Sequence, residues 1–235
     1  MKYLALSSFA LLAAAGSVNK GALTVTVNGQ DQTFYVVGTN EWVGTTTSGS
    51  SVTLQHGDRA YLSTQSEDSL NPDNFYTFSM MGTTVEYDVT FNGVSCSCNA
   101  AIYTVQMPGR QQDGTPNPGS GDYYCDANDG NGQWCPEMDL FEANENVIAM
   151  TPHKCDDPGS SQEYWNCDRD GCQTNTWYVD SGMFGLGKQI DTSRTFHHST
   201  SYNGCGDSID SISATLSQDS NSRTFGVCGQ YDYQS

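Results

Sequence analysis

The sequence is poor in positive charge, with 9 Lys and Arg against 27 Asp and Glu and a net charge of −18. Binding to nucleic-acid phosphates or to anionic membrane surfaces requires clustered Lys and Arg. The composition therefore argues against both kinds of partner, whereas neutral polymers such as polysaccharides remain natural partners. A simpler explanation of the acidity is that it keeps a secreted protein soluble.

Long hydrophobic runs are absent except at residues 4–15, directly after the basic start Met1-Lys2-Tyr3. This run is too short to span a bilayer and ends in small residues, as is typical of a secretory signal peptide. We predict a signal peptide over residues 1–17, cleaved near residues 15–18. The rest, residues 18–235, is expected to be a single domain of a soluble, extracellular protein with no membrane association.

Cysteine is not scarce, but paired Cys-x-x-Cys motifs of the zinc-binding kind are absent. We therefore expect no metal bound by cysteine. All nine cysteines follow the predicted signal peptide, and export favours disulfide bonds. The odd count leaves one thiol unpaired or a partner missing.

Long helical periodicity is absent too. Apolar and polar residues alternate instead in short runs, separated by Gly, Asn, Asp and Ser, at residues 23–27, 33–37, 59–62, 76–78, 84–91 and 101–107. A period of two is typical of strands with one buried face. Many short strands with turn signals between them predict an all-β fold, a β-sandwich or jelly roll.

Three carboxylates lie within six positions, at Glu137, Asp139 and Glu142, among apolar residues. Glu137 and Asp139 share one face of a strand, whereas Glu142 falls on the opposite face. A β-bulge around Leu140–Phe141 would bring all three acids to one face. The outer glutamates would then lie about 13 Å apart at Cα, and inclined side chains could close the carboxyls to the ~5–5.5 Å of retaining glycosidases.

Three interpretations compete for this acid cluster. It is a solvated polar face, or a calcium site, or the acid/base pair of a glycosidase. For calcium, Asp126, Asn128 and Glu137 take the first, third and twelfth places of an EF-hand loop, but Asn131 replaces the required Gly and flanking helices are absent. We favour the glycosidase, because like charges close together keep one acid ionised and another protonated.

The segment Cys-Pro-Glu-Met-Asp-Leu-Phe-Glu-Ala-Asn at residues 135–144, followed by Thr-Pro-His-Lys-Cys at 151–155, resembles the active-site strand of family 7 glycoside hydrolases, the fungal-type cellulases. Further segments that resemble the family lie at residues 96–103, 168–172 and 184–192. Asn-Glu-Trp at residues 40–42 more weakly resembles an early strand of the family that carries a Trp. The resemblance covers about residues 51–200. It implies a curved β-sandwich or jelly roll of the concanavalin-like type, whose concave sheet carries a groove for β-1,4-glucan.

Carried over residue by residue, the resemblance makes Glu137 the nucleophile and Glu142 the acid/base. Asp139 would hold and polarise Glu137, by a hydrogen bond, and His153 would line the site near the acid/base. The resemblance implies no cofactor and no metal, and we expect a monomer.

Four further residues are candidate sugar contacts. Asn99 and Tyr103 match family positions that face the sugar, and Trp42 and Trp134 are candidate stacking platforms because a flat apolar ring suits a pyranose face. Three of these residues, Tyr103, Trp42 and Trp134, have a structural alternative as core aromatics. His153 likewise has the alternative of a structural histidine after a proline turn.

Two departures from the family matter. Cellobiohydrolases of the family grip product with an Arg in an Asn-Pro-Tyr-Arg segment, but residues 175–178 here read Asn-Thr-Trp-Tyr. With the short connection from Cys125 to Cys135, this favours an open groove and an endo-β-1,4-glucanase. The alternatives are a catalytically weak glucan-binding or cell-wall interaction protein, and a β-1,3/1,4-glucanase like those of family 16, which share the Glu-x-Asp-x-x-Glu pattern.

The second departure is length, because family members are usually well over a hundred residues longer. Either the tail 207–235 supplies substitute strands around residues 209–216 and 224–228, or it is the remnant of a truncated chain. In the second case the sheet would be incomplete. We expect Cys98 to be the unpaired thiol, with a lost partner of Cys205 or Cys228 as the rival explanation.

Overall fold

The computed structural model describes residues 17–119, 121–205 and 208–229, and nearly all of the predicted signal peptide lies outside this part. The chain divides into two compact units, one ending at Tyr76 and the other beginning at Thr77. The single domain over residues 18–235 stays a prediction.

The first unit is a small β-structure. Its three-stranded sheet has the order β1-β2-β5, formed by Asn19–Val27, Gln30–Gly38 and Ala60–Ser63. A hairpin of β3 (Thr46–Ser48) and β4 (Ser51–Thr53) and the 3-10 turn η1 (Pro72–Asn74) complete it. The β1–β2 turn is Asn28-Gly29, both with positive φ, which is the backbone that a two-residue hairpin requires.

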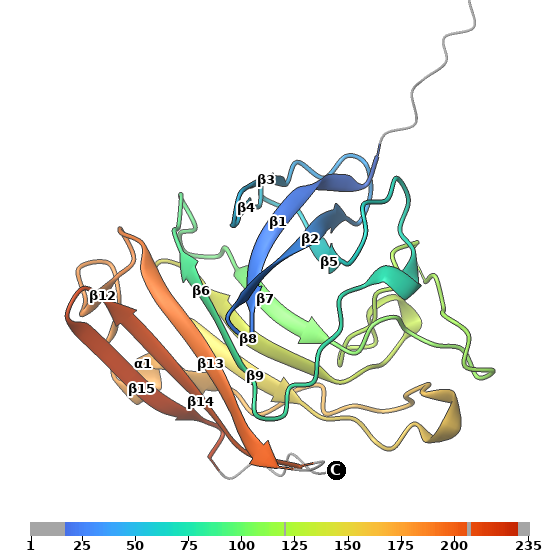
Figure 1. The fold of residues 1–235 in the computed structure, drawn as a ribbon. Helices are drawn as coiled ribbons and strands as arrows, with labels where there is room; N and C mark the ends of the chain where they lie inside the picture. Colours follow the sequence, from blue (N-terminus) through green and yellow to red (C-terminus); the bar gives the residue numbers. More distant parts are fainter. Residues whose placement is uncertain (1–16, 120, 206–207, 230–235) are drawn as a thin grey trace, which may run out of the picture. The chain divides into compact units, whose positions relative to one another are not determined.

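The second unit contains two four-stranded sheets, with the orders β10-β9-β8-β7 and β15-β14-β13-β6 (Figure 1). The first comprises β7 (Ala100–Val105), β8 (Glu137–Ala143), β9 (Ile148–His153) and β10 (Thr174–Asn175). The second comprises β6 (Thr84–Val89), β13 (Phe196–Cys205), β14 (Ser208–Gln218) and β15 (Asn221–Val227). Short elements are η2 (Gly130–Gly132), η3 (Gly159–Ser161), α1 (Thr176–Val179), β11 (Phe184–Gly185) and β12 (Ile190–Asp191).

The core of the second unit lies between these two sheets. Leu140 and Ile148 from the first sheet belong to one buried cluster with Ala214 and Leu216 from the second, and all four are fully buried. A fully buried aliphatic side chain as large as leucine contributes about 1.5–3 kcal/mol to stability. The all-β sandwich predicted from the sequence is therefore confirmed.

The tail of the chain forms strands of this sandwich. β14 pairs with β13 on one side and with β15 on the other, and the segments expected at residues 209–216 and 224–228 coincide with these two strands. Cys228, directly after β15, forms a disulfide bond with Cys172. The tail therefore supplies two strands of the sandwich, and a disulfide bond within the second unit holds its end.

Two further disulfide bonds join Cys125 to Cys135 and Cys155 to Cys167. Cys98 forms no disulfide within the described part of the chain, and neither does the exposed Cys96. The rival explanation through Cys228 is wrong, because Cys228 is paired with Cys172. The side chain of Cys205 lies outside the described part.

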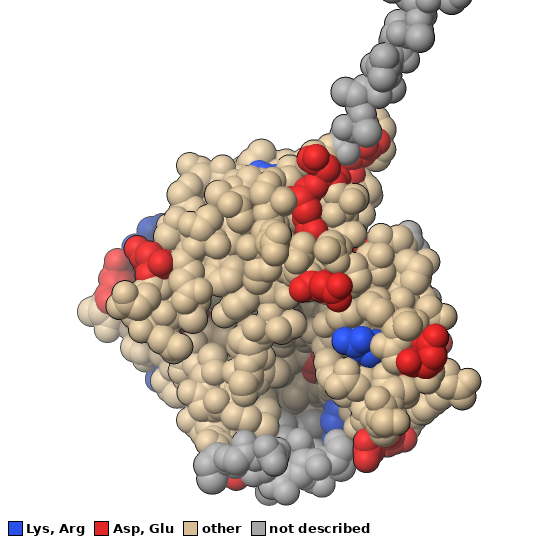
Figure 2. All heavy atoms as spheres, turned by 45° about the vertical axis from the view of Figure 1, so that its right-hand side comes forward, with Lys and Arg blue, Asp and Glu red and all other residues tan. Residues whose placement is uncertain are grey.

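The surface reflects the acidic composition. On the face drawn in Figure 2, Asp and Glu side chains are scattered among uncharged residues, and Lys and Arg are few. Among the described helices, none is long and apolar enough to cross a membrane.

Candidate active site

A bulge in β8 brings the three carboxylates together. On β9, Asp139 pairs with Thr151 and Glu142 with Ala149, so three steps along β8 correspond to two along its neighbour. The extra residue lies within Leu140–Phe141, and both of these side chains are buried in the core. The predicted bulge is confirmed. Its physical cause is that two successive apolar residues can face the core only if the alternation is interrupted there.

The register identifies which side chains share a face with the acids, because directly paired residues of a sheet point to the same side. Glu137 pairs with His153, Asp139 with Tyr103 and Thr151, and Glu142 with Ala101 and Ala149. The opposite face of β8 carries the buried Met138 and Ala143. One face of the β10-β9-β8-β7 sheet therefore carries the acids, and the other contributes to the core.

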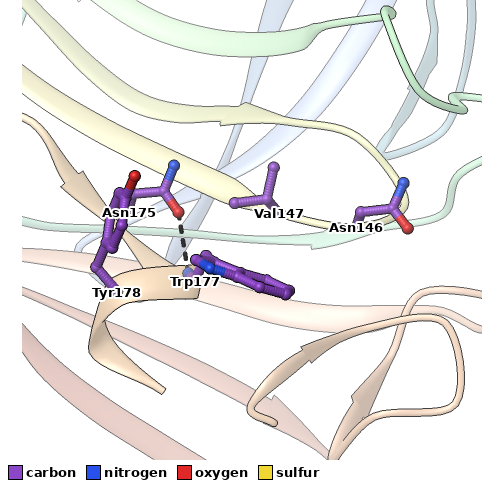
Figure 3. Close-up of a pocket in the computed structure, with 5 residues that line it drawn as sticks. All are labelled: Asn146, Val147, Asn175, Trp177 and Tyr178. Atoms are coloured by element: carbon purple, nitrogen blue, oxygen red, sulfur yellow. Dashed lines mark hydrogen bonds between the residues drawn. The ribbon is translucent and has the colours of Figure 1, made fainter. Parts of the chain in front are cut away.

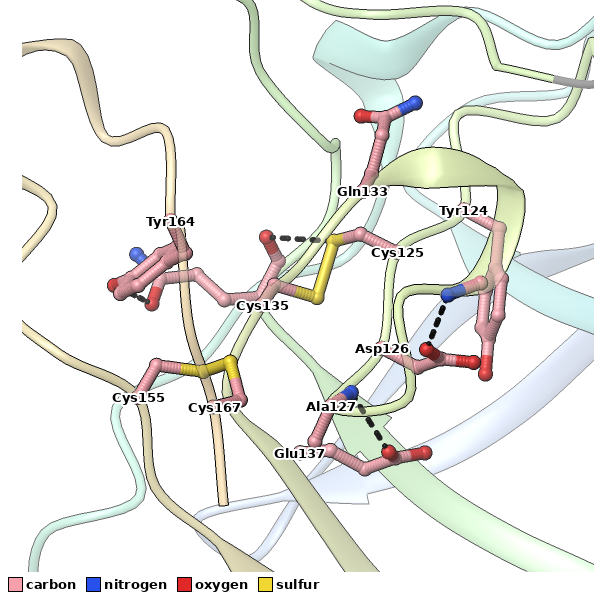
Figure 4. The surroundings of a disulfide bond; sticks show 12 residues. Tyr124, Cys125, Asp126, Ala127, Gln133, Cys135, Glu137, Cys155, Tyr164 and Cys167 are labelled. Atoms are coloured by element: carbon pink, nitrogen blue, oxygen red, sulfur yellow. Dashed lines mark hydrogen bonds between the residues drawn. A yellow bond between two sulfur atoms is a disulfide. The ribbon is translucent and has the colours of Figure 1, made fainter. Parts of the chain in front are cut away.

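Glu137 lies at the start of β8 beside the Cys125–Cys135 disulfide (Figure 4). Its Oε2 accepts a hydrogen bond of 3.1 Å from the backbone N–H of Ala127. Burial raises the pKa of Glu137 to about 7, the charges of Asp139 and Asp126 add to the rise, and the Ala127 hydrogen bond opposes it. Glu137 therefore changes its charge near neutral pH.

Asp139 is buried and paired with His153. Nε2 of His153 lies 3.2 Å from Oδ2 of Asp139, and Nδ1 lies 2.8 Å from the carbonyl oxygen of Asp168. Burial alone would lower the pKa of His153, but the two hydrogen bonds and the charges of Asp139 and Glu137 outweigh it and raise the pKa to about 9. At neutral pH the imidazolium donates both of its N–H groups, one of them to the Asp139 carboxylate.

One expectation for this pair needs correction. The expected hydrogen bond between Asp139 and Glu137 is not formed, because Asp139 accepts from His153 while Glu137 accepts from Ala127. His153 lies directly across from Glu137 in the register, and its charge also reaches Glu142, where it opposes the rise in pKa. Asp139 thus acts on Glu137 through its charge, and His153 holds that charge in place.

Glu142 lies at the other end of the acid cluster. Its Oε1 accepts a hydrogen bond of 2.9 Å from Nδ2 of Asn99. Burial raises the pKa of Glu142, the charge of Asp139 raises it further, and the Asn99 hydrogen bond opposes the rise. The two glutamates therefore flank one buried carboxylate, which disfavours the ionisation of both.

The other predicted sugar contacts differ in position. Tyr103 is half-buried on the face of the acids, with its ring edge-on to Tyr124. Trp134 is half-buried beside the Cys155–Cys167 disulfide, and the Arg169 guanidinium lies 5.6 Å from its ring centroid. One face of that ring is therefore already occupied by a cation.

Trp42 lies in the first unit. Its side chain is 85% exposed, in a turn between β2 and β3. The sequence expectation that it belongs to an early strand is wrong, because Gly38 ends β2 four residues earlier.

One carboxylate oxygen of Asp126, near Glu137, is occupied by hydrogen bonds from the backbone. Oδ1 of Asp126 accepts hydrogen bonds from the backbone N–H groups of Asn128 and Gly130, at 2.8 and 2.7 Å. Among the described residues, no three His, Cys, Asp or Glu side chains are grouped to hold a metal ion. The Asp126 carboxylate thus shapes the loop that presents the Ala127 N–H to Glu137.

Several functional groups have weak or no sequence signals. The Ala127 N–H and the Asp168 carbonyl are backbone groups, so their residue types do not reveal their roles. The residue type of Gly171 did give a signal, because this glycine lies within the segment 168–172 that resembles the family. Its φ is +59°, and a Cβ added there would lie 2.7 Å from Cε1 and Nδ1 of His153.

Gly171→Ala is therefore expected to displace His153 from Asp139. The added methyl group meets the ring at a distance that real Cβ atoms do not tolerate, and the positive φ disfavours alanine as well. We expect the pKa of His153 to fall from about 9 towards its ordinary value, as measured by NMR titration of the ring. Gly187→Ala, with a positive φ but open space around it, is the control. An unchanged His153 titration in Gly171→Ala would contradict the contact.

Glu137→Gln is expected to stabilise the protein at alkaline pH. Glu137 ionises in the unfolded chain near its ordinary pKa of 4.5 but in the folded protein only at about 7, so the free energy of unfolding falls as the pH rises between these values. The glutamine variant cannot ionise at this position, so its free energy of unfolding does not fall in this way. We expect a gain of about 1–2 kcal/mol at pH 8, after allowance for solvent exposure, and little at pH 4. Urea unfolding at both pH values measures it, with Glu145→Gln as the control. An equal effect at both pH values would contradict the raised pKa.

Comparison with known proteins links this geometry to a family. The sequence profile of glycosyl hydrolase family 7 matches residues 124–222, which include all three acids and His153. The chain belongs to glycosyl hydrolase family 7. It is 32% identical over 192 residues to endoglucanase EG-1 of Trichoderma longibrachiatum, covering 68% of this chain and 38% of that protein. It is 30% identical over 191 residues to endoglucanase type C of Fusarium oxysporum, covering 65% and 43%.

The chain thus spans about two fifths of the length of these family 7 relatives. Among solved structures, it is similar to an endoglucanase I complexed with cellobiose (TM-score 0.68, 21% identity, 92% of this chain and 74% of that one). It is also similar to a cellobiohydrolase of Melanocarpus albomyces complexed with cellotetraose (TM-score 0.62, 20% identity, 89% and 71%). At these identities the likeness establishes the family 7 fold.

Proposed function

We propose that this protein is a secreted, retaining endo-β-1,4-glucanase that hydrolyses cellulose or related β-glucans. One observation carries the proposal: Glu137 and Glu142 share a sheet face and flank the buried Asp139–His153 pair, and the pKa values of both glutamates are raised. Double displacement at a glycosidic bond requires one ionised carboxylate as nucleophile beside one carboxyl group that holds its proton. The endoglucanase relatives support the substrate class.

In the proposed mechanism, ionised Glu137 attacks the anomeric carbon while protonated Glu142 donates its proton to the leaving glycosidic oxygen. The glycosyl–enzyme ester then reacts with water, which gives a proton to the Glu142 carboxylate as its oxygen attacks the same carbon. Two inversions retain the β configuration. The Ala127 N–H orients Glu137, the Asn99 amide orients Glu142, and the charge of Asp139 opposes the build-up of negative charge on either.

The function is tested by the release of reducing ends from carboxymethylcellulose, mixed-linkage β-glucan and 1,3-linked glucan by the fully disulfide-bonded protein. Cleavage of carboxymethylcellulose with a rapid fall in viscosity supports an endo-acting β-1,4-glucanase. Cleavage of only the mixed-linkage or 1,3-linked polymers would favour an activity like that of family 16. Binding without cleavage of any polymer would favour the glucan-binding protein and contradict the proposal.

A further inference from the structure

An exposed arginine anchors the loop 126–132 from a distant part of the chain. Nη2 of Arg169 donates a hydrogen bond of 3.1 Å to the backbone carbonyl oxygen of Asn128, which lies 41 residues earlier. α1 shows a local anchor instead, because Oδ1 of Asn175 accepts a hydrogen bond of 2.9 Å from the N–H of Trp177, two residues later (Figure 3). The Arg169 contact joins two separate loops, so it fixes the position of one relative to the other.

The Arg169 side chain has a second contact, with the ring of Trp134. The guanidinium carbon lies 5.6 Å from the ring centroid, a distance at which a cation and an aromatic face attract each other. Trp134 in turn packs against Ala127 and the Cys155–Cys167 disulfide, and Ala127 is fully buried. A planar guanidinium can stack on a ring and still donate hydrogen bonds from its edge. Arg169 therefore contacts the loop near its start and the chain just beyond its end.

The anchored loop supplies the hydrogen-bond donor of the nucleophile. Ala127 directly precedes Asn128, and its N–H donates to Oε2 of Glu137 at 3.1 Å. The charges that act most on Glu137 are those of Asp139, Asp126 and His153. Arg169 therefore reaches Glu137 through the position of the loop rather than through its own charge.

The turn 168–171 holds the other neighbour of the nucleophile as well. The carbonyl oxygen of Asp168 lies 2.8 Å from Nδ1 of His153, which pairs with Glu137 across the sheet. Two adjacent residues of one turn thus hold the groups on both sides of Glu137: Asp168 through its backbone and Arg169 through its side chain.

We propose that Arg169 is a positioning residue for the nucleophile, because its guanidinium fixes the loop that presents the Ala127 N–H to Oε2 of Glu137. The hydrogen bond favours one orientation of the carboxylate, and a nucleophile has to be aligned with the anomeric carbon before it attacks. This inference rests on the proposed function for the role of Glu137, but the contact itself can be measured without turnover.

Arg169→Ala removes both contacts of the side chain, and NMR of the full chain measures the effect on the Ala127 N–H. We expect its hydrogen exchange to become about tenfold faster, the loss of one hydrogen bond from a charged donor and one exposed cation–π contact. Its proton signal should also move less when Glu137 ionises, because a longer hydrogen bond senses the charge less. Arg194→Ala is the matched control, since it removes an exposed arginine that pairs with Asp219 instead, and it should change neither quantity.

Activity gives the second measurement. In Arg169→Ala, kcat on carboxymethylcellulose should fall about threefold to tenfold with KM unchanged, because the nucleophile is less well aligned. The acid limb of the pH–rate profile should move to higher pH. The Ala127 hydrogen bond opposes the rise in the pKa of Glu137, so weakening this bond raises that pKa further.

Unchanged exchange of the Ala127 N–H in Arg169→Ala would overturn the inference, even if the pH–rate profile moved, because Arg169 would then act through its charge alone. Equally faster exchange at amides outside the loop would overturn it too, since the arginine would then only stabilise the fold. Faster exchange of the Ala127 N–H with unchanged kcat and pH–rate profile would show that the loop does not position the nucleophile. If the unsubstituted chain hydrolyses no β-glucan, the proposed function fails, whereas the two NMR measurements still decide whether Arg169 positions the Ala127 N–H at Glu137.

Discussion

Glu137→Ala is expected to lower kcat on an activated aryl β-cellobioside by about 10⁴-fold or more, because the nucleophile is lost. Sodium azide should then restore turnover, since a small anion fits the space left by the carboxylate and attacks the anomeric carbon. That attack inverts the configuration once and yields the α-glycosyl azide. Proton NMR of the product reads the configuration directly.

Glu142→Ala is the matched variant for this experiment. The aryl group leaves without a proton, so the glycosyl–enzyme at Glu137 still forms, and azide attack on it should yield the β-glycosyl azide. Glu145→Ala removes a carboxylate three residues further along the chain and should leave turnover unchanged. A β-azide from Glu137→Ala would contradict the assigned roles, and so would a comparable loss of activity in Glu145→Ala.

Asp139→Asn is expected to lower kcat about 10²-fold, the order of effect seen when one preorganised electrostatic partner is removed. It should also move the pH–rate profile. Burial and the Asp139 charge both raise the pKa of Glu137 and of Glu142, so removing the charge lowers both pKa values. The limb set by ionisation of the nucleophile and the limb set by deprotonation of the acid/base should therefore both move to lower pH.

The same substitution weakens the hold on His153, because the imidazolium loses a hydrogen bond to a charged partner. His153→Gln is the companion variant, since it keeps a donor towards Asp139 but removes the positive charge. kcat/KM measured from pH 4 to pH 9 in both variants separates the two effects. A profile of Asp139→Asn that falls in height without moving along the pH axis would contradict the electrostatic role of Asp139.

Much of the site was predictable because strand parity is a strong constraint. Two acids two residues apart and a third at an odd offset, among apolar residues, require a bulge at Leu140–Phe141, and the register has one there. The alternation of residues 84–91 and 101–107 likewise corresponds to β6 and β7. Side chains whose direction follows from the pleat of a strand could be placed from the sequence alone.

Contacts made by loops could not be placed in that way. Asp139 accepts from His153 rather than binding Glu137, because the backbone of the 126–132 loop supplies the Ala127 N–H to Glu137 instead. Trp42 lies in a turn, since nothing in the segment 40–42 fixes where β2 ends.

The central claim is that Glu137 and Glu142 act as nucleophile and acid/base of a retaining β-1,4-glucanase. Proton NMR of the first product released from the β-1,4-linked glucose hexamer by the fully disulfide-bonded protein, recorded before mutarotation, tests it most directly. We predict initial formation of the β-anomer alone. Initial α-anomer, or no cleavage of the hexamer, would contradict the claim.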